Sequence, residues 1–309
     1  MDKENKFTLL GLTGVLIWGS GTFFERSLME AFGNFSTSGL SNLLGGLIST
    51  GVQIKSTGLK SYGKAPLRYW LICGPLYIIY RLSTSIAVGI SATREQVVTS
   101  GLIRLMWPLI TLVLTVLMFR KENKASKWFP LGVIMSILGI LVANTDAADF
   151  SLLSTLKVMF VEAFWPSLLS VISCASWGLY SNLNRKIVGQ ENYDAVGLFM
   201  IVTGVISFVV TLFIQEPQQF ASQQMVEVIY MVIFSSFLAT MFWNMSMQKG
   251  NHILVIFAAN FLPVISTILN ALFLGVELTV PMILGSVLVV AGTIWCRKCV
   301  QEVPSEATA

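Results

Sequence analysis

The segment EQVVTSGLIRLMWPLITLVLTVLMF, from Glu95 to Phe119, decides the fold. This apolar run is about long enough to cross a bilayer. Pro108 in its middle predicts a kinked helix, because a proline leaves the carbonyl four residues earlier without its partner. That carbonyl belongs to Arg104, a charge near the membrane midplane, and such a costly residue usually marks a substrate path. Because Pro263 interrupts the later run from Asn251 to Leu274 in the same way, we expect a transport pocket between the two kinked helices.

The composition identifies a membrane protein. Hydrophobic residues make up 54% of the chain and charged residues only 12%, whereas a soluble domain would carry about twice that charge. The net charge of +4 is spread over short loops, which indicates membrane orientation and no nucleic-acid partner. Cys296 and Cys299 form a C-x-x-C pair without a second pair, so neither a metal nor another cofactor is expected.

Ten apolar spans predict an all-α integral membrane protein. The first has no cleavage-site pattern, so it is read as an uncleaved helix rather than a signal peptide. The spans are Phe7–Glu25, Ser36–Ile54, Leu67–Ile90, Glu95–Phe119, Trp128–Asn144, Phe164–Asn184, Asp194–Ile214, Met225–Gln248, Asn251–Leu274 and Thr279–Trp295.

The distribution of basic residues predicts the orientation. Of the 20 Lys and Arg residues, only Arg26, Arg94 and Lys157 fall in loops on one side, while Arg81 and Arg104 lie inside spans. The others gather in segments on the opposite side, which the positive-inside rule assigns to the cytoplasm. With an even number of spans, both termini are expected in the cytoplasm, in a multi-pass protein of the cytoplasmic (inner) membrane.

An internal repeat divides the chain into two halves. Trp18-Gly19 matches Trp177-Gly178 at an offset of 159 residues, Pro108 matches Pro263 at 155, and Gly139 matches Gly292 at 153. Five helices in each half give the halves opposite orientations, an architecture in which the site lies between them at the midplane. We predict a first repeat over residues 1–145, an extracytoplasmic connection over 146–163, a second inverted repeat over 164–299 and a cytoplasmic tail over 300–309.

At these same points the sequence resembles the drug/metabolite transporter superfamily in its ten-helix EamA-type form, and most of all the bacterial aromatic amino-acid exporters. The resemblance implies two inverted five-helix halves around a central cavity, with transport by alternating access and without nucleotide hydrolysis. It also implies that Trp107-Pro108 and Trp243-Asn244 line the cavity. The residues that carry it are Trp18-Gly19, Tyr80, Gly89, Gly101, Trp107-Pro108, Trp177, Trp243-Asn244, Gly250, Phe261 and Pro263.

Two arginines depart from the exporter pattern. Arg81 lies about 21 Å above the inner end of its helix, and Arg104 about 13 Å below the outer end of the next. Across a core of about 30 Å the two are at nearly equal depth and can face one cavity. Guanidinium groups bind carboxylate or phosphate as a planar fork, which favours an anionic or zwitterionic ligand. In the alternative, each arginine caps a carbonyl freed by a kink or pairs with Glu95.

Aromatic and amide residues complete the predicted site. The rings could form an apolar cage, although aromatic residues in membrane helices also serve as interfacial anchors. Asn residues at lipid depth also bond helices to one another. The predicted substrate-binding residues are Trp18, Tyr80, Arg81, Arg104, Trp107, Trp177, Tyr180, Trp243, Asn244, Phe257 and Asn260, and the predicted hinges are Gly101, Pro108 and Pro263.

The acidic residues limit the mechanism. Glu25, Glu95, Glu227 and Glu277 all sit near predicted span ends, so no buried carboxylate is expected to relay protons. A facilitator or exchanger is then the simpler mechanism. An enzyme is not expected, because a hydrolase serine would need a base or an acid pair.

We therefore predict a secondary transporter of a small carboxylate-bearing metabolite, with an amino acid as the leading substrate. The first alternative is uptake or exchange of a more anionic or nucleoside-bearing metabolite, such as an organophosphate or an S-adenosyl compound. A non-transporting membrane scaffold or sensor is the minor one. The expected partners are the substrate and the lipid bilayer, for a monomer or weak homodimer.

Overall fold

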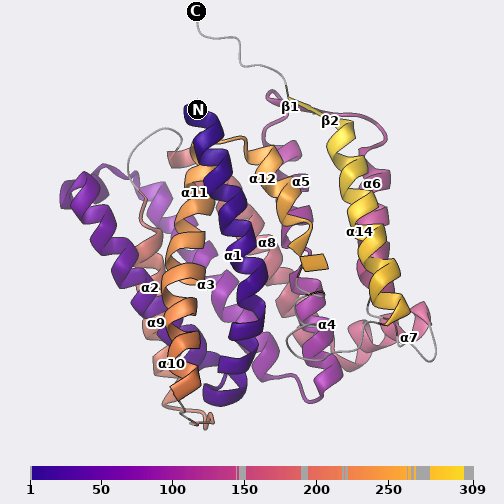
Figure 1. Ribbon diagram of the computed structural model, residues 1–309, viewed down its shortest axis with the longest axis horizontal. Coiled ribbons are helices and arrows are strands. Elements are labelled where there is room, and N and C mark those ends of the chain that lie inside the picture. Colours follow the sequence, from indigo (N-terminus) through magenta and orange to yellow (C-terminus); the bar gives the residue numbers. More distant parts are fainter. Residues whose placement is uncertain are drawn as a thin grey trace, which may run out of the picture.

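Apolar helices make up most of the computed structural model, which describes residues 2–143, 145, 151–188, 194–217, 219, 222–262, 264–265, 268 and 279–302 (Figure 1). The first half contains α1 (Lys3–Phe32), α2 (Asn34–Thr57), the 3-10 helix η1 (Leu59–Lys64), α3 (Leu67–Gly89), α4 (Arg94–Arg104), α5 (Trp107–Met118) and α6 (Phe129–Ala143). The second contains α7 (Leu152–Lys157), the π-helix η2 (Val158–Glu162), α8 (Phe164–Val188), α9 (Val196–Thr211), α10 (Ser222–Ile229), the π-helix η3 (Tyr230–Ala239), α11 (Thr240–Lys249), α12 (His252–Ala259) and α14 (Val280–Cys299).

Apart from the fourth span, the helices follow the predicted spans where the chain is described, but several ends differ. The first helix continues past Glu25 to Phe32 and stops at Gly33, whose φ of 86° is strained for any residue with a Cβ. Only one residue therefore separates α1 from α2. In the predicted connection, α7 and η2 lie at 90° to α8.

The prediction of one kinked helix from Glu95 to Phe119 is wrong. The chain breaks into α4 and α5, and Pro108 lies in the first turn of α5, where a missing N–H costs nothing. No arginine among the described residues caps the carbonyl of Arg104. It accepts instead from the Cys174 thiol of α8, with the sulfur 3.1 Å from the oxygen.

Small residues allow helices of the two halves to pack closely. A Cβ on Gly139 of α6 would lie 2.7 Å from the carbonyl oxygen of Gly285 on α14, and one on Gly46 of α2 would lie 2.7 Å from that of Gly197 on α9. Glycine lets the backbones touch at these points, as is typical of helices packed in membranes. Figure 1 shows α2 and α9 at one edge of the bundle and α6 and α14 at the other.

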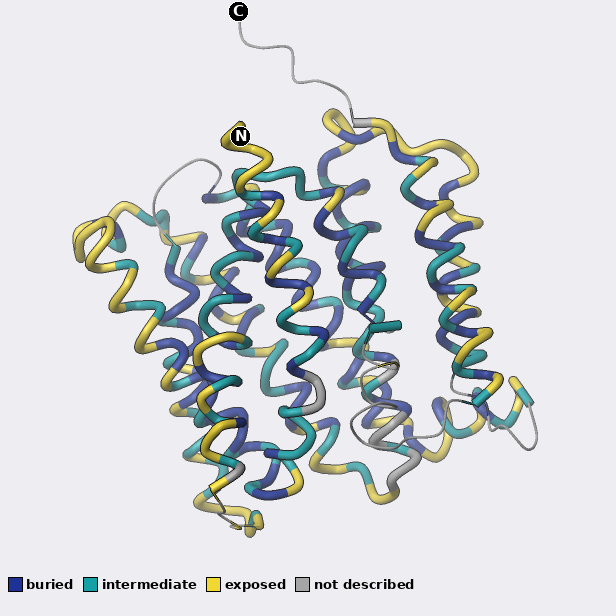
Figure 2. The backbone as a smooth tube through the Cα atoms, viewed as in Figure 1, coloured by how far each residue is buried: buried dark blue, intermediate teal, exposed yellow. Residues whose placement is uncertain are grey.

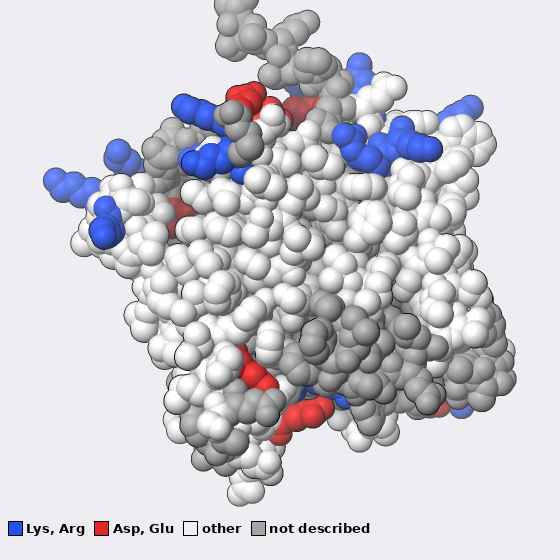
Figure 3. Space-filling view, viewed as in Figure 1, with Lys and Arg blue, Asp and Glu red and all other residues white. Residues whose placement is uncertain are grey.

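The outer surface is apolar over a broad band. Within the described chain, three helices are long and apolar enough to cross a membrane, namely Leu67–Gly89, Gln224–Lys249 and Val280–Cys299, and the number rises to five if each bent pair counts as one span. Exposed residues run along the outward faces of the helices and buried ones face the centre (Figure 2). Lys and Arg side chains gather at the upper end of the molecule, above a surface almost free of charge (Figure 3).

A short sheet ties the two halves together at that upper end. Strand β1 (Asn123–Ala125), which follows α5, pairs antiparallel with β2 (Val300–Glu302), which follows α14. The start of α1 lies at the same end, so both ends of the described chain lie on one side of the bundle (Figure 1).

Candidate functional site

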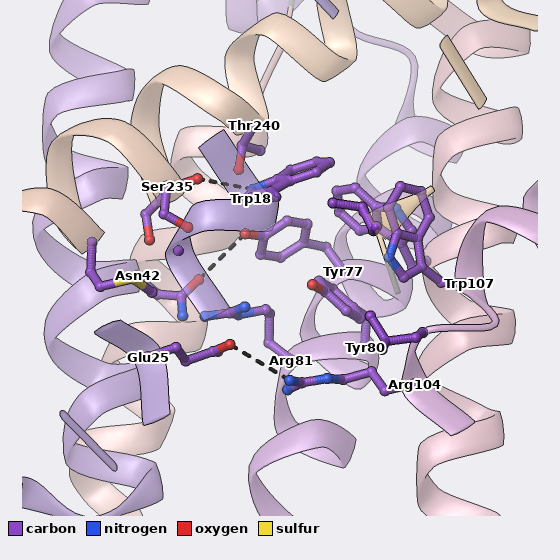
Figure 4. A pocket seen from close by; sticks show the side chains of 16 residues that line it. Trp18, Glu25, Asn42, Tyr77, Tyr80, Arg81, Arg104, Trp107, Ser235 and Thr240 are labelled. Atoms are coloured by element: carbon purple, nitrogen blue, oxygen red, sulfur yellow. Dashed lines mark hydrogen bonds and ion pairs between the residues drawn. The ribbon is translucent and has the colours of Figure 1, made fainter. Parts of the chain in front are cut away.

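A cavity of about 110 Å³ lies inside the bundle (Figure 4). This is several times the space that one water molecule needs, so it can hold a small solute. Its walls come from both halves of the chain. They are formed by Trp18, Gly21, Glu25, Asn42, Tyr77, Tyr80, Arg81, Arg104, Leu105, Trp107, Trp177, Met231, Ser235, Ser236, Thr240 and Leu262.

Four tryptophans cluster at one side of the cavity, and three of them form the wall that we call the aromatic wall. Trp18 lies 5.8 Å from Trp107, 5.7 Å from Trp177 and 5.6 Å from Trp243, measured between ring centroids. Most of these pairs meet edge to face, an arrangement that stabilises aromatic contacts beyond the area they bury. Trp18, Trp107 and Trp177 line the cavity, whereas Trp243 is fully buried behind them.

The π-helix η3 supplies a polar edge to this wall. A π-helix shifts the usual hydrogen bonds by one residue, and such segments often occur at functional sites. The indole Nε1 of Trp18 donates to the carbonyl of Ser235, at 3.1 Å. This bond fixes the Trp18 ring across the two halves and leaves the Ser235 and Ser236 side chains beside the cavity.

Arg81 brings an incompletely bonded charge into the cavity. Its guanidinium carbon lies 5.7 Å from the centroid of the Tyr80 ring, within reach of a cation–π contact. Its Nε is buried and has no hydrogen-bond partner among the described residues. Beside it, the Tyr77 hydroxyl donates to Oδ1 of Asn42 at 3.3 Å. Arg81 can therefore donate a hydrogen bond to an anion bound in the cavity.

Arg104 lies against an acid that the sequence analysis misplaced. Its Nη2 is 3.6 Å from Oε2 of Glu25, and both side chains are partly exposed, Arg104 by 27% and Glu25 by 17%. Glu25 was expected near the end of its span. Because α1 continues for two further turns, its carboxylate instead lines the cavity. Arg104 thus pairs with Glu25, whereas the side chain of Glu95, its partner in the alternative prediction, lies outside the described part of the structure.

Two predicted binding residues belong to a hydrogen-bonded cluster outside the cavity lining. Nδ2 of Asn244 donates to the Tyr180 hydroxyl at 3.0 Å and to Oδ2 of Asp194 at 3.1 Å. The other carboxylate oxygen of Asp194 accepts from the Val196 N–H at 2.9 Å and from the Tyr69 hydroxyl at 3.4 Å. These bonds join α3, α8, α9 and α11. Tyr180 and Asn244 thus hold the helices behind the aromatic wall.

The remaining predicted residues take other positions. Phe257 packs against Phe261, and Asn260 donates to the carbonyl of Ile256, so neither lines the cavity. Gly101 lies one turn before the α4–α5 break, and a Cβ there would meet open space. Pro263 lies outside the described residues.

The lining residues that the sequence analysis missed had a recognisable spacing. Glu25 follows Gly21 by four residues and Trp18 by seven, which places all three on one face of α1. Tyr77 precedes Arg81 by four residues on α3 in the same way. Marking the residues three, four and seven positions away from the predicted Trp18 and Arg81 would therefore have found Glu25 and Tyr77. Asn42 and Ser235 show no comparable pattern.

Comparison with known proteins agrees with this architecture. The profile of the EamA-like transporter family matches residues 5–145 and 164–297. The chain is 22% identical to the aromatic amino acid exporter YddG of Salmonella typhimurium, over 95% of this chain and 97% of the relative, and 21% identical to YddG of Escherichia coli over the same shares. It is 24% identical to the uncharacterized transporter YyaM of Bacillus subtilis, over 70% of this chain and 68% of the relative. A crystal structure superposes with a TM-score of 0.74 at 20% identity, covering 94% of this chain and 96% of that one.

Proposed function

The chain belongs to the EamA-like transporter family, and from that premise we propose that it carries a small carboxylate-bearing metabolite across the cytoplasmic membrane by alternating access. It is a membrane transporter of the drug/metabolite transporter superfamily and not an enzyme. An amino acid is the leading substrate. The two YddG relatives are aromatic amino acid exporters, and the three tryptophans of the cavity wall suit an apolar or ring-bearing side chain.

The observation that carries this proposal is the Arg81 guanidinium across the cavity from the aromatic wall. A charged group inside a membrane protein with an unmet donor is costly, and such groups face ligand paths rather than lipid. A carboxylate in the cavity would accept from the two terminal nitrogens of this guanidinium as a planar pair. The ring or apolar part of the same ligand would then lie against Trp18, Trp107 and Trp177.

Two features of the fold support inverted halves that could alternate access to the cavity. The family profile matches the chain twice, once in each half. If the second half repeats the first, α2 packs on its own counterpart α9 and α6 on its counterpart α14. In the same repeat, α8 is the counterpart of α1 and α11 is the counterpart of α3. The packing of α1 on α11 therefore corresponds to the packing of α3 on α8. A two-fold pseudo-symmetric transporter requires this set of pairs, with the site on the pseudo-symmetry axis.

The surface charge supports cytoplasmic termini. The Lys and Arg side chains gather at the end of the bundle where α1 begins and β2 ends (Figures 1 and 3). By the positive-inside rule, that end faces the cytoplasm.

The Glu25–Arg104 pair favours a carboxylate over a phosphate dianion. Two unpaired arginines would suit an organophosphate, the first alternative. Because Glu25 offsets the charge of Arg104, the cavity carries the excess positive charge of one arginine, which matches one carboxylate.

Counterflow of labelled amino acids in proteoliposomes tests the proposal, with Arg81→Gln as the decisive variant. Charge-assisted hydrogen bonds contribute about 1.5–3 kcal/mol each, so losing two should raise the half-saturating concentration by at least about 100-fold. Arg81→Lys keeps the charge without the planar fork, so its half-saturating concentration should lie between those of the wild type and Arg81→Gln. Arg26→Gln, in an exposed ion pair with Glu30, is the control and should transport normally. Normal counterflow by folded Arg81→Gln would refute the proposal.

A further inference from the structure

Glu25 has an unused oxygen at the cavity. Arg104 reaches only Oε2, at 3.6 Å, which is beyond hydrogen-bond distance, and no hydrogen bond to the Glu25 side chain occurs within the described part of the chain. A carboxylate accepts at about four positions. Inside a membrane protein, a carboxylate with so few partners is costly unless a ligand completes them.

Glu25 and Arg81 carry opposite charges and are neighbours on the side of the cavity opposite the aromatic wall. With Arg104 they form what we call the charged floor of the cavity. Glu25 extends from α1 and Arg81 from α3, and the ends of both side chains point into the cavity, on the side away from the tryptophans (Figure 4). They lie close enough to interact electrostatically. No hydrogen bond or ion pair joins them in the described residues, so each keeps capacity for a ligand.

We infer that Glu25 binds the ammonium group of a zwitterionic α-amino acid while Arg81 binds its carboxylate. This inference rests on the proposed function and narrows it, because a transporter of simple carboxylates needs Arg81 but not Glu25. The ammonium approaches Oε1, so Arg104 can stay at Oε2 and keep the second arginine neutralised. The side chain of the amino acid then points toward Trp18 and Trp107.

A purely structural Glu25 would show a different geometry. An ion pair that serves only to neutralise Arg104 is expected to close to about 2.8 Å, with two parallel bonds from the guanidinium. The observed contact is single and long, and both side chains stay partly exposed to the cavity. Glu25 thus makes one long contact with Arg104 through Oε2, and its other oxygen, Oε1, remains able to accept from a ligand.

Matched ligands with and without the ammonium group test the inference. The probes are phenylalanine with 3-phenylpropionate, and leucine with 4-methylpentanoate, measured by inhibition of counterflow and by thermal stabilisation of the purified protein. The readout is the ratio of the affinity for the amino acid to that for its deaminated partner. The wild type should prefer the amino acid at least 10-fold.

Two variants separate recognition of the ammonium group from a general charge effect. Glu25→Gln should reduce the preference at least 10-fold. The double variant Glu25→Gln/Arg104→Gln removes one negative and one positive charge, so it keeps the net charge of the cavity, and it should lose the preference equally. Glu30→Gln, which is exposed outside the cavity, should retain it.

The outcomes distinguish this inference from the proposed function. If the wild type binds 3-phenylpropionate as well as phenylalanine, or if Glu25→Gln leaves the ratio unchanged, the role of Glu25 is refuted while carboxylate transport stands. If the preference returns in the double variant, Glu25 acts through its charge alone and the inference is also refuted. If neither member of either pair binds, the proposed function itself fails.

Discussion

Trp107 and Trp243 should respond differently to the same substitution, although their rings touch. Their centroids lie 4.9 Å apart, and both pack against Trp18 and Trp177. Trp107 lines the cavity, whereas Trp243 is fully buried and its Nε1 donates to the Ser181 hydroxyl at 3.1 Å. Replacing each by Phe should therefore separate ligand recognition from stability.

The magnitudes follow from these positions. Trp243→Phe loses buried ring volume, at about 1–2 kcal/mol, and strands the Ser181 hydroxyl, at about 1–3 kcal/mol. The melting temperature should fall by roughly 5–10 °C. Trp107→Phe keeps a ring in the wall and should change stability by about 1 kcal/mol or less. Its poorer ring contact with a ligand, about 0.5–1.5 kcal/mol, should weaken affinity for phenylalanine about 2- to 12-fold.

Thermal unfolding followed by light scattering in detergent, together with counterflow of phenylalanine and alanine, measures both effects. Trp107→Phe should lower the preference for phenylalanine over alanine at nearly unchanged stability. Trp243→Phe should lower stability at nearly unchanged preference. If Trp243→Phe changes the preference more than Trp107→Phe does, the assignment of Trp107 to the cavity wall and Trp243 to the support behind it is refuted.

Three further predictions test the fold around the site, each by thermal unfolding of purified protein. Gly139→Ala should destabilise the protein by about 1–3 kcal/mol, because its Cβ would meet the α14 backbone. The control Gly51→Ala, whose Cβ would meet open space, should stabilise the protein by up to about 1 kcal/mol. Equal effects of the two substitutions would contradict close packing of α6 on α14. Glu216→Gln should cost about 1–2 kcal/mol, because the carboxylate accepts two backbone N–H groups at the start of α2; an unchanged melting temperature would exclude this cap. Asp194→Asn should cost about 2 kcal/mol by weakening the cluster that joins α3, α9 and α11, and a changed substrate preference without destabilisation would place Asp194 in the site instead.

The helices were predictable because a bilayer allows few alternatives. Backbone polar groups must pair within a span, so an apolar run of sufficient length becomes a helix. The ends were less predictable. The run that includes Trp18 loses its apolar character at Glu25, yet α1 continues to Phe32 because Glu25 faces the cavity instead of marking the membrane surface.

The site was predictable where depth along a helix decided it. Counting residues placed Arg81 and Arg104 at similar depth, and both line the cavity. Direction around a helix was harder to predict. Trp107 and Trp243 carry the same chemistry and both precede a polar or broken position, yet only the first faces the cavity. Asn244 likewise turns toward Asp194, a contact across 50 residues that no local pattern contains.

The broken helix and the cavity depend on each other. Non-helical backbone at membrane depth is stable only where protein covers it or where it lines a hydrated space. The break between α4 and α5 meets both conditions, because the Cys174 thiol covers the carbonyl of Arg104 and Leu105 lines the cavity. The break therefore lies where Arg104 and Trp107, on either side of it, can reach the charged floor and the aromatic wall. A proline with an arginine four residues earlier indicates such a place, because both are tolerable at membrane depth only where protein or a cavity shields them from lipid.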